Sequence, residues 1–345
     1  MSKVRIAQIG CGFRATAQVG AIAPGIEPVV CCDLNEDAAR AMQEKFGFQR
    51  TSADAVDAAS DPAVELVNVV LPPDLHAPVV QRLAPLGKPI LVEKPLAPFE
   101  EPALATVEVV HRHGTPVGVA HQYRYHPWVR ATVGALRRGE IGRVYTVLLE
   151  HSYYHNSKVP WLRQHGRYVT VSMNCHYYDL IRHMLEDEFD RVYAHVGQEP
   201  TRRTRPDDLT GDTQTIAVMH TRGGAVVDLF AHEDTRGGTP AWPLRLTLCG
   251  TKGSIFYEFR GRTEPSSAAR LEIFREEKGA REPLPFEADA PPSNLLLLEE
   301  FVASVRAGRA FPTSVYDHMN TLAVGFACHE SSERGAVVKV RRYEF

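Results

Sequence analysis

The chain lacks several features that would place it in a special class of proteins. Its 345 residues contain no apolar run near the ~20 residues that a membrane-spanning helix needs. No block of one charge is present at a formal net charge of −3, which argues against a nucleic-acid partner. The six cysteines form no Cys-x-x-Cys pair, which favours reduced thiols in a cytoplasmic protein over zinc or disulfides. No secretory leader is expected either, because the first residues lead directly into a strand.

The stretch from Pro89 to Pro95 is the most informative part of the chain. Four apolar residues read as a buried strand of a parallel sheet, and this strand stops at Glu93, Lys94 and a proline. In open α/β sheets, ligands bind just beyond the carboxyl ends of the strands. Lys94 is therefore expected beside a ligand, although these residues alone leave open a surface lysine in a tight turn.

The N-terminus has the pattern of a strand, a glycine-rich turn and a helix. The strand covers residues 3–9, and the turn follows as Gly10-Cys11-Gly12-Phe13-Arg14-Ala15. Gly10 allows the tight turn, Gly12 lets a pyrophosphate approach the backbone, and Ala15 permits close helix–strand packing. The phosphates would lie on the helix N-terminus. The pattern predicts a dinucleotide site, and a glycine turn without a ligand is the alternative.

A second strand ends at Asp33, which lies 23 positions after Gly10. An acid near this position accepts hydrogen bonds from the ribose of NAD and repels the 2′-phosphate of NADP. The next six residues contain no arginine or lysine, so NAD is favoured over NADP. The alternative role for Asp33 is to cap the helix that follows.

Strands and helices alternate through the first third of the chain. Helices are expected over residues 34–46, 76–86 and 98–113, and strands over 64–70 and 116–120. This alternation is typical of a doubly wound parallel sheet, the Rossmann architecture. We assign residues 1–121 to this NAD(P)-binding domain and residues 122–345 to a second domain.

The second domain has the pattern of an α+β fold on a large, mostly antiparallel sheet. Strands are expected over residues 143–151, 192–196, 213–220, 225–232, 244–249 and 254–259, and helices over 128–138, 294–307 and 317–330. Sheets of this kind commonly use one face for subunit association. A homodimer or homotetramer is therefore expected.

A helix expected within residues 166–185 carries an unusual polar face. Ser172, His176, Asp179 and His183 follow spacings of 4, 3 and 4, which place them on one side of a helix. A histidine titrates near neutrality and suits the removal of a hydroxyl proton. The alternative is a hydrogen-bonded core histidine. A metal site is not favoured, because the nearby pair His151 and His155 has no further ligand at a convincing spacing.

Taken together, these motifs resemble the glucose–fructose oxidoreductase/inositol dehydrogenase family (Gfo/Idh/MocA). The resemblance rests on the glycine turn, Asp33, Pro72 with His76, and above all Glu93-Lys94-Pro95. It implies oxidation or reduction of sugars and cyclitols with NAD(P), with a lysine that contacts both nicotinamide and the reacting carbinol. His176 and Asp179 match the family's Asp-x-Gly-x-His-x-x-Asp pattern. Ser172 stands where the family has its acid, and Asn174 where it has glycine.

The motifs and the resemblance together define the expected site residues. Lys94 and His176 are the expected catalytic residues. The expected cofactor-binding residues are Gly10, Gly12, Phe13, Arg14, Ala15, Asp33, Leu71, Pro72, His76, Glu93, Lys94 and Gln122. The expected substrate-binding residues are Lys94, Arg124, Tyr153, His155, Trp161, Arg163, Ser172, His176 and Asp179.

Two other functions occur among relatives of this kind. One is glycoside hydrolysis or elimination assisted by transient NAD oxidation, for which the change at Ser172 leaves room. The other is a non-catalytic, nucleotide-sensing regulator, against which the presence of both Lys94 and His176 argues.

Overall fold

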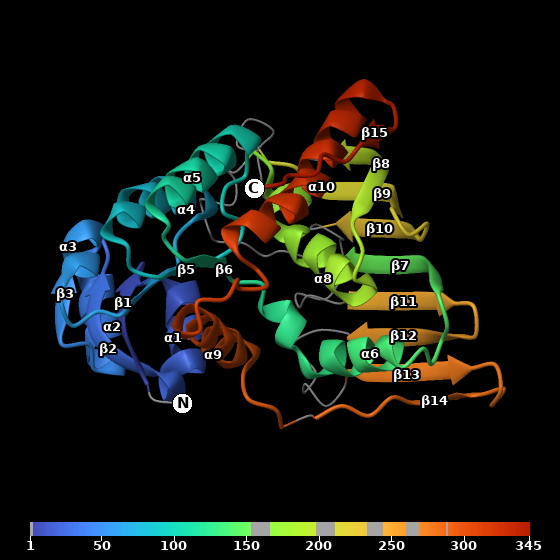
Figure 1. The fold of residues 1–345 in the computed structure, drawn as a ribbon, viewed down its shortest axis with the longest axis horizontal. Coiled ribbons are helices and arrows are strands. Elements are labelled where there is room, and N and C mark those ends of the chain that lie inside the picture. The colour runs from blue at the N-terminus through green and yellow to red at the C-terminus, as the bar shows by residue number, and fades with distance from the viewer. Residues whose placement is uncertain (1–2, 153–165, 198–210, 233–243, 260–268, 288) are drawn as a thin grey trace, which may run out of the picture. The chain divides into compact units, whose positions relative to one another are not determined.

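The chain forms two compact units. The computed structural model describes residues 3–152, 166–197, 211–232, 244–259, 269–287 and 289–345. The first unit comprises Met1–Tyr125, Pro291–Met319 and Tyr343–Phe345, and the second comprises His126–Ala290 and Asn320–Arg342 (Figure 1). The division expected after residue 121 is continuous and does not include this return of the chain to the first unit.

The first unit contains a six-stranded parallel sheet. Its strands are β1 (Val4–Ile9), β2 (Ile26–Cys32), β3 (Arg50–Ser52), β4 (Leu66–Val69), β5 (Ile90–Val92) and β6 (Val117–Val119). They lie in the order β3-β2-β1-β4-β5-β6, and every neighbouring pair is parallel. This is the Rossmann order, so the predicted doubly wound sheet is confirmed. The strand order reverses between β1 and β4, where such sheets bind their ligands.

Helices cover both faces of this sheet. They are α1 (Phe13–Ile22), α2 (Glu36–Phe46), α3 (Ala55–Ser60), α4 (Pro73–Leu83), α5 (Glu100–His113) and α9 (Ser293–Arg306), with short 3₁₀ turns at Ala23–Gly25, Ala84–Leu86 and Gln122–Tyr125. Local sequence signals set their ends. Asn35 caps the start of α2 by accepting from Asp37 N–H and Ala38 N–H, and Gly47 ends it in the left-handed conformation.

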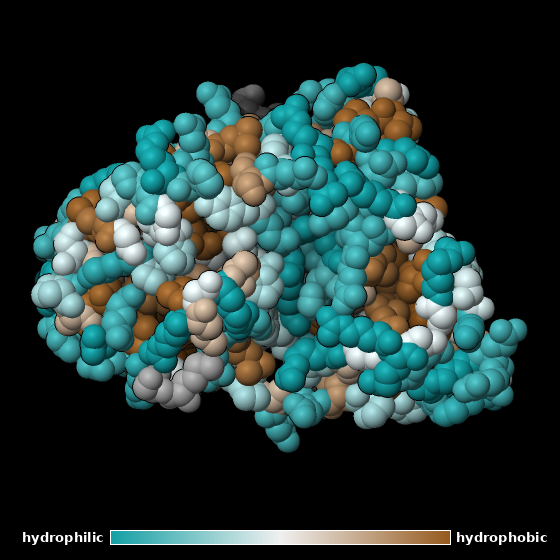
Figure 2. Space-filling model, in the orientation of Figure 1, coloured by the Kyte–Doolittle hydropathy of each residue, from teal (hydrophilic) through white to brown (hydrophobic). Residues whose placement is uncertain are grey.

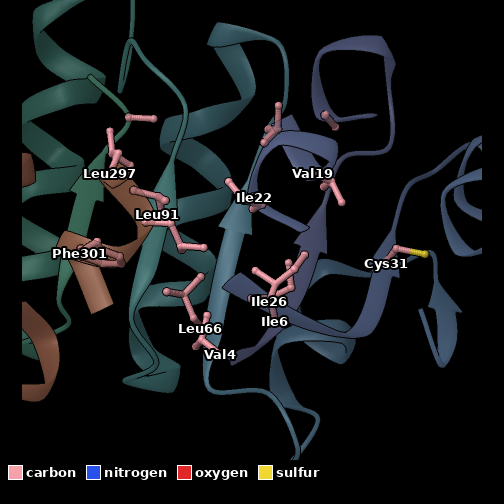
Figure 3. Close-up of a cluster of buried hydrophobic side chains, with 14 of the residues drawn as sticks. Val4, Ile6, Val19, Ile22, Ile26, Cys31, Leu66, Leu91, Leu297 and Phe301 are labelled. Atoms are coloured by element: carbon pink, nitrogen blue, oxygen red, sulfur yellow. The ribbon is translucent and has the colours of Figure 1, made fainter. Parts of the chain in front are cut away.

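The core of the first unit joins segments that are far apart in the sequence. Figure 3 shows Ile6 of β1, Ile22 of α1 and Leu66 of β4 in one cluster with Leu297 and Phe301 of α9. Each of these five side chains is at most 2% exposed. Truncation of Phe301 to alanine would leave a cavity and cost about 3–5 kcal/mol. The apolar stripe of α9 therefore anchors the returning chain to the Rossmann unit.

The second unit is built on a nine-stranded sheet. Its strands are β7 (Val144–Ser152), β8 (Phe189–Gly197), β9 (Gln214–Thr221), β10 (Val226–His232), β11 (Leu244–Gly250), β12 (Gly253–Phe259), β13 (Arg270–Arg275), β14 (Arg281–Pro283) and β15 (Val338–Lys339). The order is β14-β13-β12-β11-β7-β10-β9-β8-β15, and only β7 and β10 pair in parallel among these strands. The mostly antiparallel prediction is confirmed. The charged sequence of β13 and β14 gave no strand signal.

One face of this sheet is covered by helices. These are α6 (Pro127–Arg137), a π-helical turn (Tyr168–Met173), α8 (Cys175–Leu185) and α10 (Val315–Arg334), and Figure 1 shows α6 and α8 lying across the strands. Within β7, Val147 and Leu149 are buried beneath them, whereas Leu148 points to the other face and is 44% exposed. Among the described helices, none is long and apolar enough to span a membrane. Hydrophilic residues cover most of the surface visible in Figure 2.

Candidate cofactor-binding turn and catalytic residues

The glycine turn has the shape that a phosphate group needs. Gly10 has a φ of +92°, and a Cβ atom there would lie 2.1 Å from the carbonyl oxygen of Val70, so no other residue fits. At Gly12, by contrast, a Cβ atom would have no heavy atom within 4 Å. Gly12 is the N-cap residue of α1, whose first N–H groups have no partner within the helix. The open backbone at Gly12 and the helix N-terminus together fit a pyrophosphate.

Asp33 is positioned by the backbone on both sides. Its Oδ2 accepts from Cys11 N–H at 2.8 Å, and its Oδ1 accepts from Asn35 N–H at 2.9 Å. Asn35, and not Asp33, caps helix α2, so the capping alternative for Asp33 is wrong. A carboxylate has about four lone-pair sites, and these two bonds leave acceptors for a ribose diol. The acid is thus aligned with the glycine turn, as an NAD site requires.

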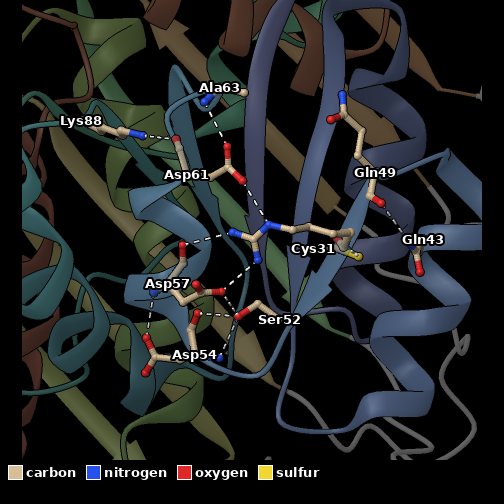
Figure 4. A network of polar contacts seen from close by, with 10 residues as sticks. Cys31, Gln43, Gln49, Ser52, Asp54, Asp57, Asp61, Ala63 and Lys88 are labelled. Atoms are coloured by element: carbon tan, nitrogen blue, oxygen red, sulfur yellow. Dashed lines mark hydrogen bonds and ion pairs between the residues drawn. The ribbon is translucent and has the colours of Figure 1, made fainter.

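The strand beside Asp33 carries an arginine that is bound by acidic residues. The carbonyl of Ser52 in β3 accepts from Asp33 N–H at 3.2 Å. Arg50 of the same strand is bound by Asp57 at 2.9 Å and Asp61 at 3.0 Å, and Figure 4 shows this network. The backbone N–H of Ala63 and the Arg50 guanidinium lower the pKa of Asp61 and keep it ionised. The Arg50 guanidinium is therefore already bound by two carboxylates and is not positioned to bind a ribose 2′-phosphate.

A chain of buried amides links the glycine turn to Glu93. Gln8 Nε2 donates to the Gly10 carbonyl at 2.8 Å, and Asn68 Nδ2 donates to Gln8 Oε1 at 2.6 Å and to Gln18 Oε1 at 2.8 Å. Gln18 Nε2 in turn donates to Glu93 Oε1 at 3.0 Å. All four side chains are at most 4% exposed. None of Gln8, Gln18 and Asn68 was predicted, although Gln8 and Asn68 are amides inside apolar strands and this was a usable signal.

Arg14 completes this network at its exposed end. Its guanidinium forms a 3.2 Å ion pair with Glu93, whose negative charge raises the pKa of Arg14. Gln122 orients its amide so that the oxygen accepts from Arg14 at 2.9 Å and the nitrogen donates to the Ala120 carbonyl at 2.7 Å. Three of the predicted cofactor residues, Arg14, Glu93 and Gln122, thus lie together in the first unit.

Lys94 lies at the carboxyl end of β5, as predicted. The side chain is half-buried, its backbone N–H approaches Glu93 Oε2 at 3.3 Å, and its peptide bond to Pro95 is cis. Behind it, His76 is buried with its Nδ1 2.7 Å from the Pro95 carbonyl and its Nε2 3.4 Å from Leu71 N–H. Burial lowers the pKa of His76. His76 thus connects Leu71, in the loop after β4, to the turn that carries Lys94.

Two apolar side chains are exposed near the glycine turn and Asp33. Phe13 at the start of α1 is 87% exposed, and Leu34, directly after Asp33, is 88% exposed. Both side chains are therefore accessible to a ligand bound at the glycine turn. Leu34 was not predicted, although an apolar residue directly after Asp33 was a signal.

Arg124, a predicted substrate residue, is held within the first unit. It binds Asp317 at 3.0 Å and the Pro312 carbonyl at 3.2 Å.

In the second unit, the predicted helix over residues 166–185 is divided in two. Ser172 N–H bonds to the Arg167 carbonyl and Asn174 N–H to the Val169 carbonyl, both spanning five residues, as in a π-helix. Regular α-helix begins only at Cys175. The common face therefore holds for His176, Asp179 and His183, but Ser172 lies in the preceding turn. The sequence spacing did not reveal this change of helical period.

A buried carboxylate holds the π-helical turn. Asp212 accepts from Val169 N–H at 2.8 Å and from Thr170 N–H at 2.9 Å, and Thr170 Oγ1 lies 2.7 Å from Thr215 Oγ1. At Gly325 of α10, a Cβ atom would approach the Thr170 carbonyl to 3.1 Å. The turn is thus fixed by β9, its preceding loop and α10. Asp212 was missed, because a single acid before a strand has no distinctive local pattern.

The predicted proton-transfer residue, His176, is buried in α8 and is 4% exposed. The predicted substrate residues Asp179 of α8 and Ser172 of the π-helical turn are 0% and 2% exposed. His151 of β7 packs its ring against Tyr177, with ring centroids 4.9 Å apart, and burial lowers the pKa of His151 to about 3. The predicted substrate residues Tyr153, His155, Trp161 and Arg163 lie outside the described residues. The possibility of a His151–His155 metal pair is therefore untested.

Comparison with known proteins agrees with this geometry. The protein-family model described as "Oxidoreductase family, NAD-binding Rossmann fold" matches residues 4–121. The family model for the GFO/IDH/MocA C-terminal domain matches residues 129–256. The chain therefore belongs to the Gfo/Idh/MocA oxidoreductase family, with an NAD-binding Rossmann domain at its N-terminus.

Several relatives that match nearly the whole chain are named as dehydrogenases. D-Apiose dehydrogenase of Paraburkholderia graminis is 28% identical, over 98% of this chain and 90% of that protein. scyllo-Inositol 2-dehydrogenase (NAD(+)) of Bacillus subtilis is 25% identical, over 98% of this chain and 96% of that protein. Levoglucosan dehydrogenase in complex with NADH superimposes with a TM-score of 0.85 at 22% identity, over 99% of this chain and 100% of that chain.

Proposed function

We propose that this protein is an NAD-dependent dehydrogenase that oxidises a CH–OH group of a sugar, a sugar derivative or a cyclitol, or reduces the corresponding carbonyl. The observation that carries the proposal is the position of Lys94. It follows β5 at the carboxyl edge of the Rossmann sheet, and hydrogen bonds through Gln18, Asn68 and Gln8 connect Glu93 beside it to the glycine turn. Several curated relatives act on polyols of this class, which supports the choice of substrate.

The first unit has the residues to hold the cofactor. The α1 N-terminus at Gly12 would bind the pyrophosphate, and Asp33 would accept from the adenosine ribose. Arg14 is paired with Glu93, and Gln122 accepts a hydrogen bond from Arg14. When bound, NAD supplies the hydride acceptor for alcohol oxidation, while the protein binds and orients the reactants.

Lys94 and His176 divide the work on the substrate in this proposal. Lys94 donates a hydrogen bond to the carbinol oxygen and favours the negative charge that develops there. His176 takes the hydroxyl proton as the carbon is oxidised and returns it in the reverse direction. Asp179, one helical turn after His176, and Ser172 would contact neighbouring hydroxyl groups. A position of this kind for a general base is worth about 10²–10⁴-fold in rate.

A substrate panel tests the proposal. Purified protein is mixed with NAD, and separately with NADP, and then with D-apiose, scyllo-inositol, myo-inositol, levoglucosan and L-sorbose. Absorbance of the reduced cofactor is followed. Formation of NADH that depends on one of these compounds and is lost in Lys94→Met supports the dehydrogenase. If Lys94→Met still forms NADH at the wild-type rate, Lys94 is not a catalytic residue.

A second candidate function follows from Ser172. A serine cannot provide the negative charge of the family acid whose place it takes, so net oxidation is not the only outcome to test. In an NAD-assisted elimination or hydrolysis, the cofactor returns to its starting state and absorbance does not change. Release of the aglycone from a nitrophenyl glycoside that requires NAD, without net NADH, would favour this function over dehydrogenation.

The open face of the nine-stranded sheet suggests how the protein associates. Leu148, Tyr193, Ile216, Val218 and Phe230 are each 39–53% exposed on this face. Tyr193 pairs with Val218 and Ile216 with Phe230 across neighbouring strands, while Asp228 lies between Val218 and Leu148 and Glu150 lies beside Phe230 on the same face. Exposed apolar pairs set among polar residues fit the composition of a subunit interface. We assign it to a homodimer or homotetramer, and the six free cysteines support a cytoplasmic location.

A further inference from the structure

The turn that carries Lys94 is bound by two histidines from distant segments. His76 of α4 lies with its Nδ1 2.7 Å from the Pro95 carbonyl oxygen. His318, in the first turns of α10, accepts from Leu96 N–H at its Nε2, at 3.1 Å. The two histidines are 1% and 0% exposed. The Pro95 carbonyl and the Leu96 N–H are therefore both satisfied by buried imidazoles.

The hydrogen bonds determine the protonation of His318. A backbone N–H group can only donate, so Nε2 of His318 must be unprotonated where it meets Leu96. The proton of the neutral ring is then on Nδ1, which lies 2.7 Å from Nε2 of His121. His121 accepts this hydrogen bond and is itself 0% exposed. The pair forms a buried chain from the lysine turn to the end of β6.

The returning chain delivers His318 to this place. After α9, Thr313 bonds to Val119 of β6 twice, through its carbonyl at 2.8 Å and its hydroxyl at 2.8 Å. Ser314 forms an antiparallel bridge with Gly118. The segment thus pairs with the edge of β6, and α10 begins directly afterwards at Val315. Because the pairing fixes the start of α10, it also fixes His318 against the turn.

We propose that His318, supported by His121, is a positioning residue for the reaction: it holds the backbone after Lys94 so that the amine meets the substrate oxygen. This inference rests on the proposed function, in which Lys94 is catalytic. The loss of the acceptor would leave Leu96 N–H unsatisfied in the interior and allow the turn to shift. A displacement of 1 Å at a reacting group can cost about 10²-fold in rate.

Two substitutions of His318 test the role of the acceptor. His318→Leu keeps an apolar side chain but has no acceptor, whereas the Oε1 of His318→Gln can take the place of Nε2. We expect His318→Leu to lower kcat by at least about tenfold with the Kd for NADH, measured by fluorescence, changed less than threefold. His318→Gln should recover most of kcat. His111→Leu is the control. His111 of α5 contacts Tyr316, which lies in α10 with His318, but it does not contact the lysine turn.

A measurement without substrate or cofactor follows the same contact. In the free protein, hydrogen exchange of Leu96 N–H should accelerate at least about tenfold in His318→Leu and return towards wild type in His318→Gln. The ¹⁵N imidazole resonances of wild-type His318 should show protonated Nδ1 and unprotonated Nε2. Protonated Nε2 would overturn the inference even if His318→Leu does not fold.

The outcomes separate this inference from the proposed function. Unchanged kcat in a folded His318→Leu, together with loss of turnover in Lys94→Met, would overturn the positioning role alone. Full turnover in Lys94→Met would overturn the proposed function and the positioning role together. An equal loss of kcat in His318→Leu and His318→Gln would mean that the imidazole's shape, and not its acceptor, matters, which also contradicts the inference.

Discussion

The backbone N–H of Cys11 donates to Oδ2 of Asp33 at 2.8 Å. This contact joins the glycine turn after β1 to the acid after β2. The acid that would recognise the adenosine ribose therefore also fixes the turn that would bind the pyrophosphate. A change at Asp33 is expected to affect both ends of the adenosine diphosphate at once.

Substitution of Asp33 by asparagine should weaken NAD binding. The amide keeps the size of the side chain but loses the charge that strengthens its hydrogen bonds, which are worth about 1.5–3 kcal/mol. The Kd for NADH should therefore rise roughly 10–100-fold, as measured by fluorescence titration or calorimetry. The Kd for NADPH should fall but stay in the weak range, because Arg50 remains bound by Asp57 and Asp61.

The control for this experiment is Asp37→Asn, on the exposed first turn of α2. It removes an acid from the same region without touching the glycine turn. An equal loss of NADH affinity in the two variants would show a general charge effect and contradict a specific role for Asp33.

The sequence predicted those parts of the site that depend on local patterns. Gly10 and Gly12 follow a strand and open a helix, Asp33 ends the next strand, and Lys94 follows a short apolar run, so their places in a Rossmann sheet could be inferred. Each inference needs only the alternation of strands and helices. For this reason the fold of the first unit and the position of Lys94 agree with the structure.

The parts that could not be predicted depend on contacts between distant segments. Asp212 binds the turn at Val169, and His318 reaches Leu96 from the far end of the chain. Nothing near these residues in the sequence indicates the partner. The π-helical turn before Cys175 depends in the same way on Asp212, since a run of residues such as 168–173 otherwise resembles an α-helix.

Replacement of either proposed catalytic residue should stop turnover but not cofactor binding. Lys94→Met and His176→Ala should each lower kcat by at least about 10²-fold, because each loses an interaction made with the reacting oxygen or its proton. The Kd for NADH should stay near wild type. Lys88→Met, before β5, is a matched control, since Lys88 bonds only to the Asp61 carbonyl in the described structure. Near-normal kcat in either catalytic variant would refute its assigned role.

A charge on the open sheet face should separate the subunits. Phe230 is 39% exposed and lies opposite Ile216 on the same face, so Phe230→Glu would place a charge in the proposed interface. We expect a smaller mass in light scattering coupled to size exclusion. Leu75→Glu is the control, because Leu75 is 47% exposed on α4 of the first unit and is not part of this sheet. An unchanged mass for Phe230→Glu, or a monomeric wild type, would contradict the assignment of this face.

Buried His151 should make the protein less stable in acid. Burial lowers the pKa of His151 to about 3, whereas an unfolded histidine has a pKa near 6.5. Between these values the unfolded chain binds the extra proton, so the free energy of unfolding falls as pH decreases from 6.5. From pH 7 to pH 5, this residue should account for about 2 kcal/mol of that loss.

His151→Gln removes the titrating ring and should therefore flatten the acid dependence. Urea unfolding at pH 7 and pH 5 gives the two free energies, and their difference should be smaller in His151→Gln than in wild type by about 2 kcal/mol, whatever the absolute stability of the variant. His113→Gln, at the exposed end of α5, should leave this difference unchanged. If His151→Gln loses as much stability as wild type between pH 7 and pH 5, the acid sensitivity comes from other groups and not from His151.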